Sequence, residues 1–417
     1  MNTMCNRTKK AQKVNRKVLI ATIDIGKKSH YGYWRSYNSA DCKPFEFANT
    51  RKGFDFFWHK IRAASIMHKA EEIIVGFEST GSYGEPLVHY LRTKPVKIVQ
   101  VNPMHTKRIK ELDDNSPRKT DKKDPRVIAN IIQYGHYLTL VVPTGAAAEL
   151  RRLTNARESK IAKRTASMNR LQDLLGIIFP EFLIIMKGVK TKSAQYLLKH
   201  YLLPEKIAAL GYTSLAKKLH KISRGKLGPE RAQALISAAK NTIGVTEGIE
   251  SICMEIQQLL ADISSYNIFI ETCCEKMEDY LEKIPYSRYL LSIKGFGIVT
   301  AAGIIGEVAD FHAFHSQKAI LKLAGLNLFE VSSGIHKGIR RISKRGRALL
   351  RKILYFAALN VVRKGGILHQ YYQKLINRGM LKIKALTAVM RKLLRIMFAL
   401  VRDKTTYNRE YSLKKAA

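Results

Sequence analysis

The chain has 417 residues, enough for two or three domains, and its 46% apolar content excludes a disordered polycation. Its net charge of +40, from 73 basic and 33 acidic side chains, predicts nucleic acid as a partner. Charged residues such as Arg391, Lys392 and Arg395 interrupt the longest apolar stretch, so we expect no membrane span and a cytoplasmic location. Five cysteines without zinc-ligand spacing indicate a reducing compartment and no structural metal cluster.

The first part of the chain is predicted to form an α/β domain. Residues 1–17 are a polar, basic arm. Between 18 and 145, the stretches KVLIATIDIG, HYGYWRSY and PFEFANT have the composition of strands in a meander. A helix follows, and then EEIIVGFEST and KIVQVN read as strands that alternate with helices, ending with the helix DPRVIANIIQYG. This order predicts a mixed sheet.

Four acids stand out in this basic domain. Asp24 and Glu78 each end an apolar strand, while Asp121 and Asp124 lie at the start of the last helix. Carboxylates at strand ends and a helix start can converge at one edge of a sheet, and a divalent cation removes the cost of burying them together. We therefore expect a Mg²⁺ site, with Mn²⁺ as the alternative ion. The simpler alternatives are that Asp124 caps its helix and that Asp121 is solvated in a loop.

Residues 146–286 are predicted to be helical. A long basic helix spans 146–178, and shorter basic helices and loops follow at 183–245. The a/d seam of a coiled coil over five heptads is formed by Ile249, Ile252, Ile256, Leu259, Ile263, Tyr266, Ile270, Cys273, Met277, Tyr280 and Ile284. A helix of this length, roughly 50 Å, suits contact with a partner or spacing between domains. The alternative is a long helix that packs within its own domain.

Residues 287–402 are predicted to form a compact helical domain, followed by a tail at 403–417. The stretch IKGFGIVTAAGIIGEV places Gly295 and Gly297 just before a helix of small residues. Glycines at this point let the backbone approach a phosphate, as in a helix-hairpin-helix contact with DNA. Tight helix packing through glycine and alanine is the alternative.

A serine pair in VSSGIHKGIRRISKRGRALLRK is the candidate nucleophile. Ser333 precedes a glycine that gives access to its hydroxyl, and Ser332 is the alternative. The basic residues that could neutralise a phosphate beside it are Lys337, Arg340, Arg341, Lys344 and Arg345. No base other than Glu330 or His336 lies nearby, so a serine that merely caps a turn remains the simpler interpretation of the stretch alone.

The motifs TIDIGKKSH, GFESTGSY, KTDKKDPRVIA, SIKGFGIVTAAGIIGEV, LAGLN, SSG and SKRGRALLRKILY together resemble the DEDD transposases of bacterial insertion sequences. This Piv-invertase-like group consists of bridge-RNA-guided serine recombinases. The resemblance implies a RuvC-like, ribonuclease-H-like fold for residues 18–145 and a C-terminal transposase domain. It also implies Mg²⁺ bound by Asp24, Glu78, Asp121 and Asp124, and a nucleophile at Ser333.

The family's reaction would be cleavage and rejoining of DNA strands through a phosphoserine, guided by a non-coding bridge RNA at the bacterial nucleoid. The basic residues of 146–286 would hold that RNA. The resemblance further implies a homo-oligomer, a dimer or tetramer, in which the acids of one subunit complete the serine site of another. Two other functions are weighed: a metal-dependent Holliday-junction-type endonuclease that uses water, and a non-enzymatic RNA-binding or architectural protein.

Overall fold

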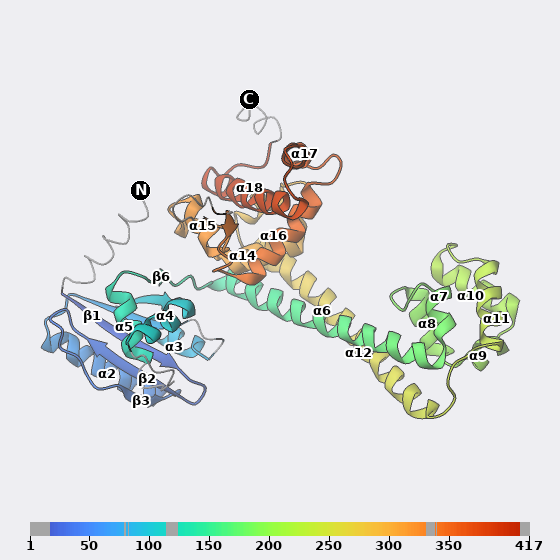
Figure 1. Ribbon diagram of the computed structural model, residues 1–417, viewed down its shortest axis with the longest axis horizontal. Helices are drawn as coiled ribbons and strands as arrows, with labels where there is room; N and C mark the ends of the chain where they lie inside the picture. The colour runs from blue at the N-terminus through green and yellow to red at the C-terminus, as the bar shows by residue number, and fades with distance from the viewer. Residues whose placement is uncertain are drawn as a thin grey trace. The chain divides into compact units, whose positions relative to one another are not determined.

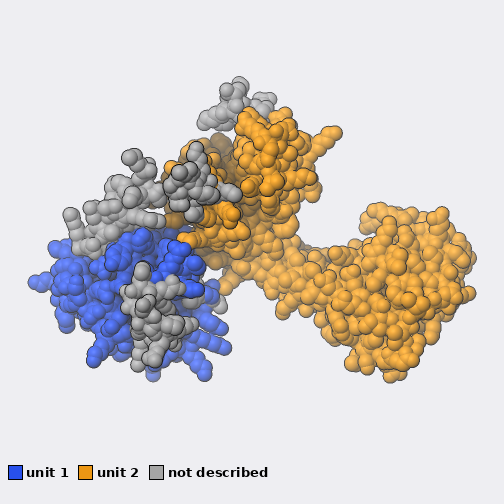
Figure 2. All heavy atoms as spheres, in the orientation of Figure 1, with its two compact units in different colours: residues 1–141 blue, residues 142–417 orange. Residues whose placement is uncertain are grey.

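The computed structural model describes residues 17–78, 81, 83–113, 124–330, 338 and 340–408. The chain divides into two compact units, residues 1–141 and 142–417 (Figure 2). Within the described part of the chain, no helix combines the length and the hydropathy that crossing a bilayer requires.

Unit 1 is an α/β fold that follows the order predicted from the sequence (Figure 1). Its strands are β1 (Val18–Ile25), β2 (Ser29–Arg35), β3 (Phe45–Ala48), β4 (Glu72–Glu78), β5 (Lys97–Val101) and β6 (Leu138–Thr139). Its helices are α2 (Arg51–Met67), α3 (Glu85–Leu91), α4 (Pro103–Asp113) and α5 (Asp124–Gln133). The helix α4 and the short strand β6 were not predicted.

The strands form one six-stranded sheet in the order β3-β2-β1-β4-β5-β6. The strands β1, β4 and β5 run parallel to one another, whereas β2, β3 and β6 pair antiparallel to their neighbours. The prediction of a mixed sheet is therefore confirmed, and the arrangement is compatible with a ribonuclease-H-like domain. Because β1 and β4 are parallel and adjacent, their carboxyl ends meet at the same edge.

Helices cover both faces of this sheet, because the side chains of a strand alternate between its faces. One face buries Leu19, Ile23, Val75 and Phe77 against α2 and α3, with Phe57 and Leu87 in the same cluster. The other face buries Val18, Ile20, Ile74 and Val99 against α5, with Ile128 and Ile132. Each central strand is thus apolar on both sides, and a polar residue near its end stands out.

Unit 2 consists almost entirely of helices. Its first part contains α6 (Gly145–Ile178), α7 (Pro180–Ile185), α8 (Lys192–His200), α9 (Pro204–Ala209), α10 (Tyr212–Ser223), α11 (Pro229–Lys240) and α12 (Ile249–Glu282). Its second part contains α13 (Ser287–Leu291), α14 (Ile298–Val308), η1 (Phe311–Ala313), α15 (Gln317–Leu323), β7 (Leu328–Phe329), β8 (Arg341–Ile342), α16 (Ala348–Val361), α17 (His369–Asn377) and α18 (Lys382–Arg402).

The two longest helices, α6 and α12, pack side by side and run antiparallel (Figure 1). Arg170 donates to both carboxylate oxygens of Glu255 at 2.7 and 2.9 Å. Nearer the start of α6, Arg164 donates to the Asn267 side chain at 2.7 Å. The earlier residue on α6, Arg164, contacts the later residue on α12, Asn267, so the two helices run antiparallel.

The seam predicted for residues 249–284 is the face of α12 that turns inward in this pair. Ile256, Ile263, Ile270, Cys273 and Met277 are buried, and the remaining seam positions are at least partly buried. The seam is therefore covered within the chain, as in the alternative of a helix that packs in its own domain. Its periodicity does not require a second subunit, and the predicted oligomer rests on the resemblance alone.

A separate hydrophobic cluster lies at each end of the helix pair. Helices α7–α11 pack around the end of α6 and the start of α12, with Phe182 and Leu197 fully buried. The opposite ends of the pair contribute Leu150 and Met277 to the core of the C-terminal helices. A Cβ atom added at Gly306 of α14 would lie 2.7 Å from the Arg151 backbone nitrogen, so glycine permits this close approach of α14 to α6.

We predict that Ile263→Ala destabilises unit 2, because the substitution leaves a cavity in the buried α6–α12 seam. Loss of a buried isoleucine side chain typically costs about 2–5 kcal/mol. The matched control is Ile268→Ala on the same helix, where the side chain is 63% exposed and the expected cost is below about 0.5 kcal/mol. Thermal unfolding followed by circular dichroism compares the two variants. Equal melting temperatures would contradict the pairing.

Candidate active site

Asp24 and Glu78 lie on one face of the sheet at the carboxyl ends of neighbouring strands. The parallel register pairs Ile23 of β1 with Phe77 of β4, and both of these side chains belong to the α2–α3 face. The residue after each of them therefore faces the other way, toward α5. Both carboxylates are only partly exposed. The strand register thus places the ends of these two strands side by side, and their role as metal ligands stays a prediction.

The start of α5 is tied to the same face. The Thr22 hydroxyl, two residues before Asp24 on β1, donates to the Pro125 carbonyl oxygen at 2.6 Å. Asp124 is the first residue of α5 and is 7% exposed. On the neighbouring strand, a Cβ atom at Gly76 would lie 2.2 Å from Ile132 of α5. Two independent contacts thus hold α5 against the strands that carry the other two acids.

A tight turn between β1 and β2 follows Asp24. The Gly26 N–H donates to Nδ1 of His30 at 3.2 Å, and His30 is fully buried. Burial lowers the pKa of His30, although the nearby Asn49 side chain opposes this shift. The neutral ring keeps the lone pair that accepts from Gly26. A Cβ atom at Gly26 would lie 2.3 Å from the Ser29 carbonyl oxygen, so this turn requires glycine.

The acid set suits a hard divalent cation, since carboxylate oxygens are the ligands that Mg²⁺ prefers. The strand register and the contacts of α5 bring Asp24, Glu78 and Asp124 to one face. Asp121 lies outside the described residues. Within the described ranges, no three His, Cys, Asp or Glu side chains form a group that could hold a metal ion. Asp24, Glu78 and Asp124 thus lie on one face of the sheet. The predicted fourth ligand, Asp121, is the residue that the structure does not describe.

The predicted serine stretch is closed at its base by a short ladder between two chain segments. Leu328 pairs with Ile342, and Phe329 pairs with Arg341. At one end of the ladder, the Ser343 hydroxyl donates to the Asn327 side chain at 2.6 Å. At the other end, Arg340 Nε donates to the Glu330 carboxylate at 2.7 Å. Ser332, Ser333 and Lys337 lie outside the described residues.

The basic residues next to the ladder are exposed. Arg341, Lys344 and Arg345 have exposed side chains, and among the described residues none of them forms an ion pair. Arg340 differs from them, since Glu330 binds it and raises its pKa by a side-chain hydrogen bond. An exposed pair of this kind contributes little to stability, because water screens it. A phosphate could therefore replace Glu330 as the partner of Arg340 at little cost.

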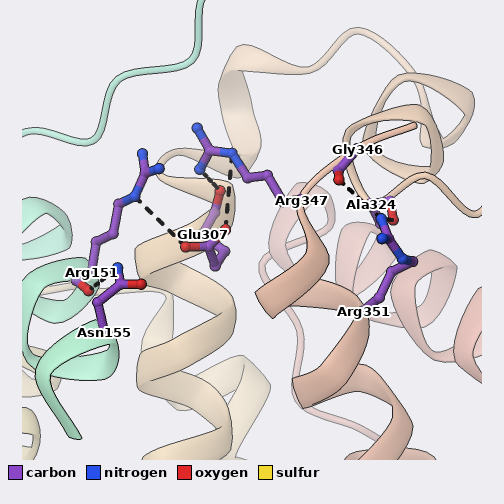
Figure 3. A network of polar contacts seen from close by, with 7 residues as sticks. All are labelled: Arg151, Asn155, Glu307, Ala324, Gly346, Arg347 and Arg351. Atoms are coloured by element: carbon purple, nitrogen blue, oxygen red, sulfur yellow. Dashed lines mark hydrogen bonds and ion pairs between the residues drawn. The ribbon is translucent and has the colours of Figure 1, made fainter. Parts of the chain in front are cut away.

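Backbone contacts fix the segment that leads out of the ladder. Lys344 N–H donates to the Gly325 carbonyl at 3.0 Å, and Arg347 N–H donates to the Leu323 carbonyl at 2.9 Å. The Arg351 guanidinium then bridges the carbonyl oxygens of Ala324 at 3.1 Å and Gly346 at 3.0 Å (Figure 3). The end of α15 and the start of α16 are thereby joined directly below the ladder.

Glu307, at the end of α14, is a buried acid between two arginines, and we did not predict its role from the sequence. Its side chain is 5% exposed and forms ion pairs with Arg151 at 3.6 Å and Arg347 at 3.9 Å (Figure 3). Arg347 also donates to the Glu307 carbonyl oxygen. Burial lowers the pKa of Arg347 to about 10; the Arg151 charge acts in the same direction, and Glu307 opposes it. A lone acid in the apolar stretch IVTAAGIIGEV was the available signal.

Gly295 and Gly297 lie in the exposed turn between α13 and α14. Gly295 has a φ of +102°, which favours glycine, and Gly297 precedes the first residue of α14. The tight helix packing weighed as an alternative is made by other residues of the motif, including Gly303 and Gly306. The turn is thus open to a phosphate, and the DNA contact stays a prediction.

Comparison with known proteins identifies two matching family models. One, a DEDD-type transposase model of the IS110 group, matches residues 21–180. The other, described as the transposase IS116/IS110/IS902 family, matches residues 287–373. The first match contains the acids of unit 1, and the second contains the serine stretch with the ladder at its base.

Similar proteins belong to bacterial insertion elements. A 43.6 kDa protein of insertion element IS110 from Streptomyces coelicolor is 24% identical over 92% of this chain and 94% of its own length. A 42 kDa protein of IS900 from Mycobacterium paratuberculosis is 26% identical over 70% of this chain and 73% of its own length. A transposase for insertion sequence element IS1111A from Coxiella burnetii is 28% identical over 30% of this chain and 34% of its own length.

We predict that Glu307→Gln destabilises unit 2, because it leaves the charges of Arg151 and Arg347 near each other without the buried carboxylate. Removing one partner of a fully buried pair costs about 3–5 kcal/mol, and partial exposure of Arg151 reduces this to roughly 2–3 kcal/mol. The control is Glu255→Gln, which removes an exposed pair with Arg170 and should lower the melting temperature much less, because water screens that pair. Thermal melting of both variants measures the difference. Equal losses in melting temperature would show that the burial of Glu307 does not contribute to stability.

Proposed function

The chain belongs to the IS110/IS116/IS902 family of transposases, and on that premise we propose how this DNA transposase carries out strand transfer. In the proposed reaction, Ser333 is the nucleophile and the four acids Asp24, Glu78, Asp121 and Asp124 hold Mg²⁺. The observation that carries the proposal is the meeting of Asp24 and Glu78 at neighbouring strand ends, on the face where α5 begins with the buried Asp124. Acids placed in this way have no role in a purely architectural nucleic-acid-binding protein.

The proposed reaction is an exchange of phosphodiester bonds. The Ser333 hydroxyl oxygen attacks a DNA phosphorus atom, its proton leaves, and a bond forms between serine and phosphate. The bond from phosphorus to one deoxyribose oxygen breaks, and that oxygen takes up a proton as a hydroxyl. A hydroxyl of the new partner strand then attacks the phosphoserine and releases the serine. Each step replaces one P–O bond by another, so no energy cofactor is needed.

The residues at the base of the serine stretch would bind and orient the DNA phosphate. Arg341, Lys344 and Arg345 are exposed beside the ladder and can neutralise phosphate charge. Arg340 can leave Glu330 and bind a phosphate as the strand approaches. A bound Mg²⁺ would supply charge neutralisation at the phosphate oxygens. The acids on this chain would fix its position, and the ladder would hold the serine within reach of the phosphate.

A guide RNA and an oligomer complete the proposal. Exposed basic residues, including Lys192, Lys199, Lys217 and Lys221, occur on the helices that follow α6, and such residues bind RNA through its phosphates. We propose that they hold the bridge RNA. Because the covered α6–α12 seam offers no open apolar face for a partner, the proposed dimer or tetramer would form through other surfaces.

We predict that Ser333→Ala abolishes the covalent protein–DNA adduct while DNA binding changes by less than about twofold, since only the nucleophile is lost. A denaturing gel detects the adduct on labelled element-end DNA, and a mobility-shift assay measures binding. The matched control is Ser332→Ala, which should retain the adduct. An adduct in Ser333→Ala that disappears in Ser332→Ala would move the nucleophile by one residue. An adduct in both variants would exclude this mechanism.

A second candidate is a metal-dependent, structure-specific endonuclease that uses water as the nucleophile. It is favoured by the same acids, because a RuvC-like site needs only carboxylates and metal ions. We predict that Asp24→Asn reduces strand cleavage at least about 100-fold under both mechanisms, through weaker metal binding. Cleavage of a Holliday junction by Ser333→Ala decides between them. Full hydrolysis by that variant would replace strand transfer with the endonuclease.

A further inference from the structure

Three basic side chains lie together on α18, away from the serine stretch in sequence. Arg391 and Lys392 are only partly exposed, and Arg395 is exposed one turn later. Lys392 Nζ lies 4.2 Å from the ring centroid of Tyr371 on the adjacent helix α17. The Nε–H of Arg391 is buried and has no hydrogen-bond partner among the described residues. We call Arg391, Lys392 and Arg395 the α18 basic cluster.

Among the residues that the structure describes, no Asp or Glu forms an ion pair with this cluster. The sequence contains no Asp or Glu between Glu330 and Asp403, and Asp403 is bound by Arg402 at 2.7 and 3.0 Å. Burial lowers the pKa of Arg391, the Arg395 charge lowers it further, and among the described groups only Tyr371 acts in the other direction. Burial also lowers the pKa of Lys392. Half-buried cations that repel one another cost free energy that the chain itself does not recover.

A polyanion that binds through its phosphates would supply the negative charge that the cluster lacks. The ammonium of Lys392 covers one face of Tyr371, so that face cannot stack on an unpaired base. The cluster therefore offers charge without a stacking platform, which suits the regularly spaced phosphates of a duplex better than single-stranded bases. Among duplexes, DNA is the substrate of a transposase.

We propose that Arg391, Lys392 and Arg395 form a binding surface for the phosphate backbone of duplex DNA, distinct from the serine stretch. The proposal deepens the proposed function, and it rests on the transposase acting on DNA, independently of the serine mechanism. The surface would hold the duplex by its backbone and carry no base specificity. The negative charge of the DNA backbone would then compensate Arg391, whose Nε–H has no hydrogen-bond partner among the described residues.

The test compares Arg391→Gln/Arg395→Gln in the full chain with the wild type. Fluorescence anisotropy measures affinity for a labelled DNA duplex between about 50 and 200 mM NaCl without divalent cations. We expect affinity to fall about tenfold at the middle of this range, and the slope of log K against log salt to become shallower by roughly 2. Arg402→Gln is the matched control on the same helix, because its charge is already paired, and it should change affinity by less than about twofold.

Two further measurements keep the result interpretable. Arg391→Met should melt at or above the wild-type temperature, because it removes an uncompensated charge; a lower melting temperature with unchanged DNA affinity would make Arg391 structural and overturn the proposal. Arg395→Gln alone, at an exposed site, cannot act through misfolding, and its salt slope should be shallower by about 1. An unchanged slope overturns the proposal, as does a loss of affinity confined to an RNA duplex. Binding by Ser333→Ala should be unaffected, so failure here and failure of the serine mechanism are separate results.

Discussion

Unit 2 depends on the apolar contact between α6 and α12. Residues about 100 positions apart in the sequence meet along this pair, as the hydrogen bond between Arg164 and Asn267 illustrates. One end of the pair supplies the core of α7–α11, and the other contributes Leu150 and Met277 to the core of the C-terminal helices. The C-terminal helices that carry the serine stretch are consequently built on the base of this pair, and α14 joins them to α6 through Gly306.

The scarcity of acids shapes the rest of the molecule. In a chain with a net charge of +40, several of the few carboxylates have specific arginine partners. Glu307 holds two arginines between α6, α14 and α16, and Glu330 holds Arg340 at the end of the ladder. Asp24 and Glu78 of unit 1 instead lie on one face of a sheet. The sequence has no acid from residue 331 to 402, and exposed cations of this range such as Arg341, Lys344 and Arg345 form no ion pair among the described residues.

Much of unit 1 could be predicted from the sequence, because strands and the acids at their ends are local features. The apolar runs in KVLIATIDIG and EEIIVGFEST placed Asp24 and Glu78 at strand ends, and the parallel register put those strand ends side by side. The helix α4 was missed because its stretch, PMHTKRIKELD, has few apolar residues to form a helical stripe. The contact between Thr22 and Pro125 was also missed, since a buried hydroxyl on an apolar strand gives no signal of its own.

The sequence by itself determined the chemistry of the chain: its basic charge, the mixed sheet with acids at its strand ends, and the long helix with a regular apolar seam. The tertiary structure decided what those features contact. A heptad pattern predicts that one face of a helix is buried, but it does not identify the segment that covers that face. In this structure the covering segment is α6 of the same chain. The role of Glu307 and the ladder below the serine stretch likewise depend on segments brought together from separate parts of the sequence. A pattern of residues cannot encode that pairing, because it reports periodicity and composition but no distance between segments.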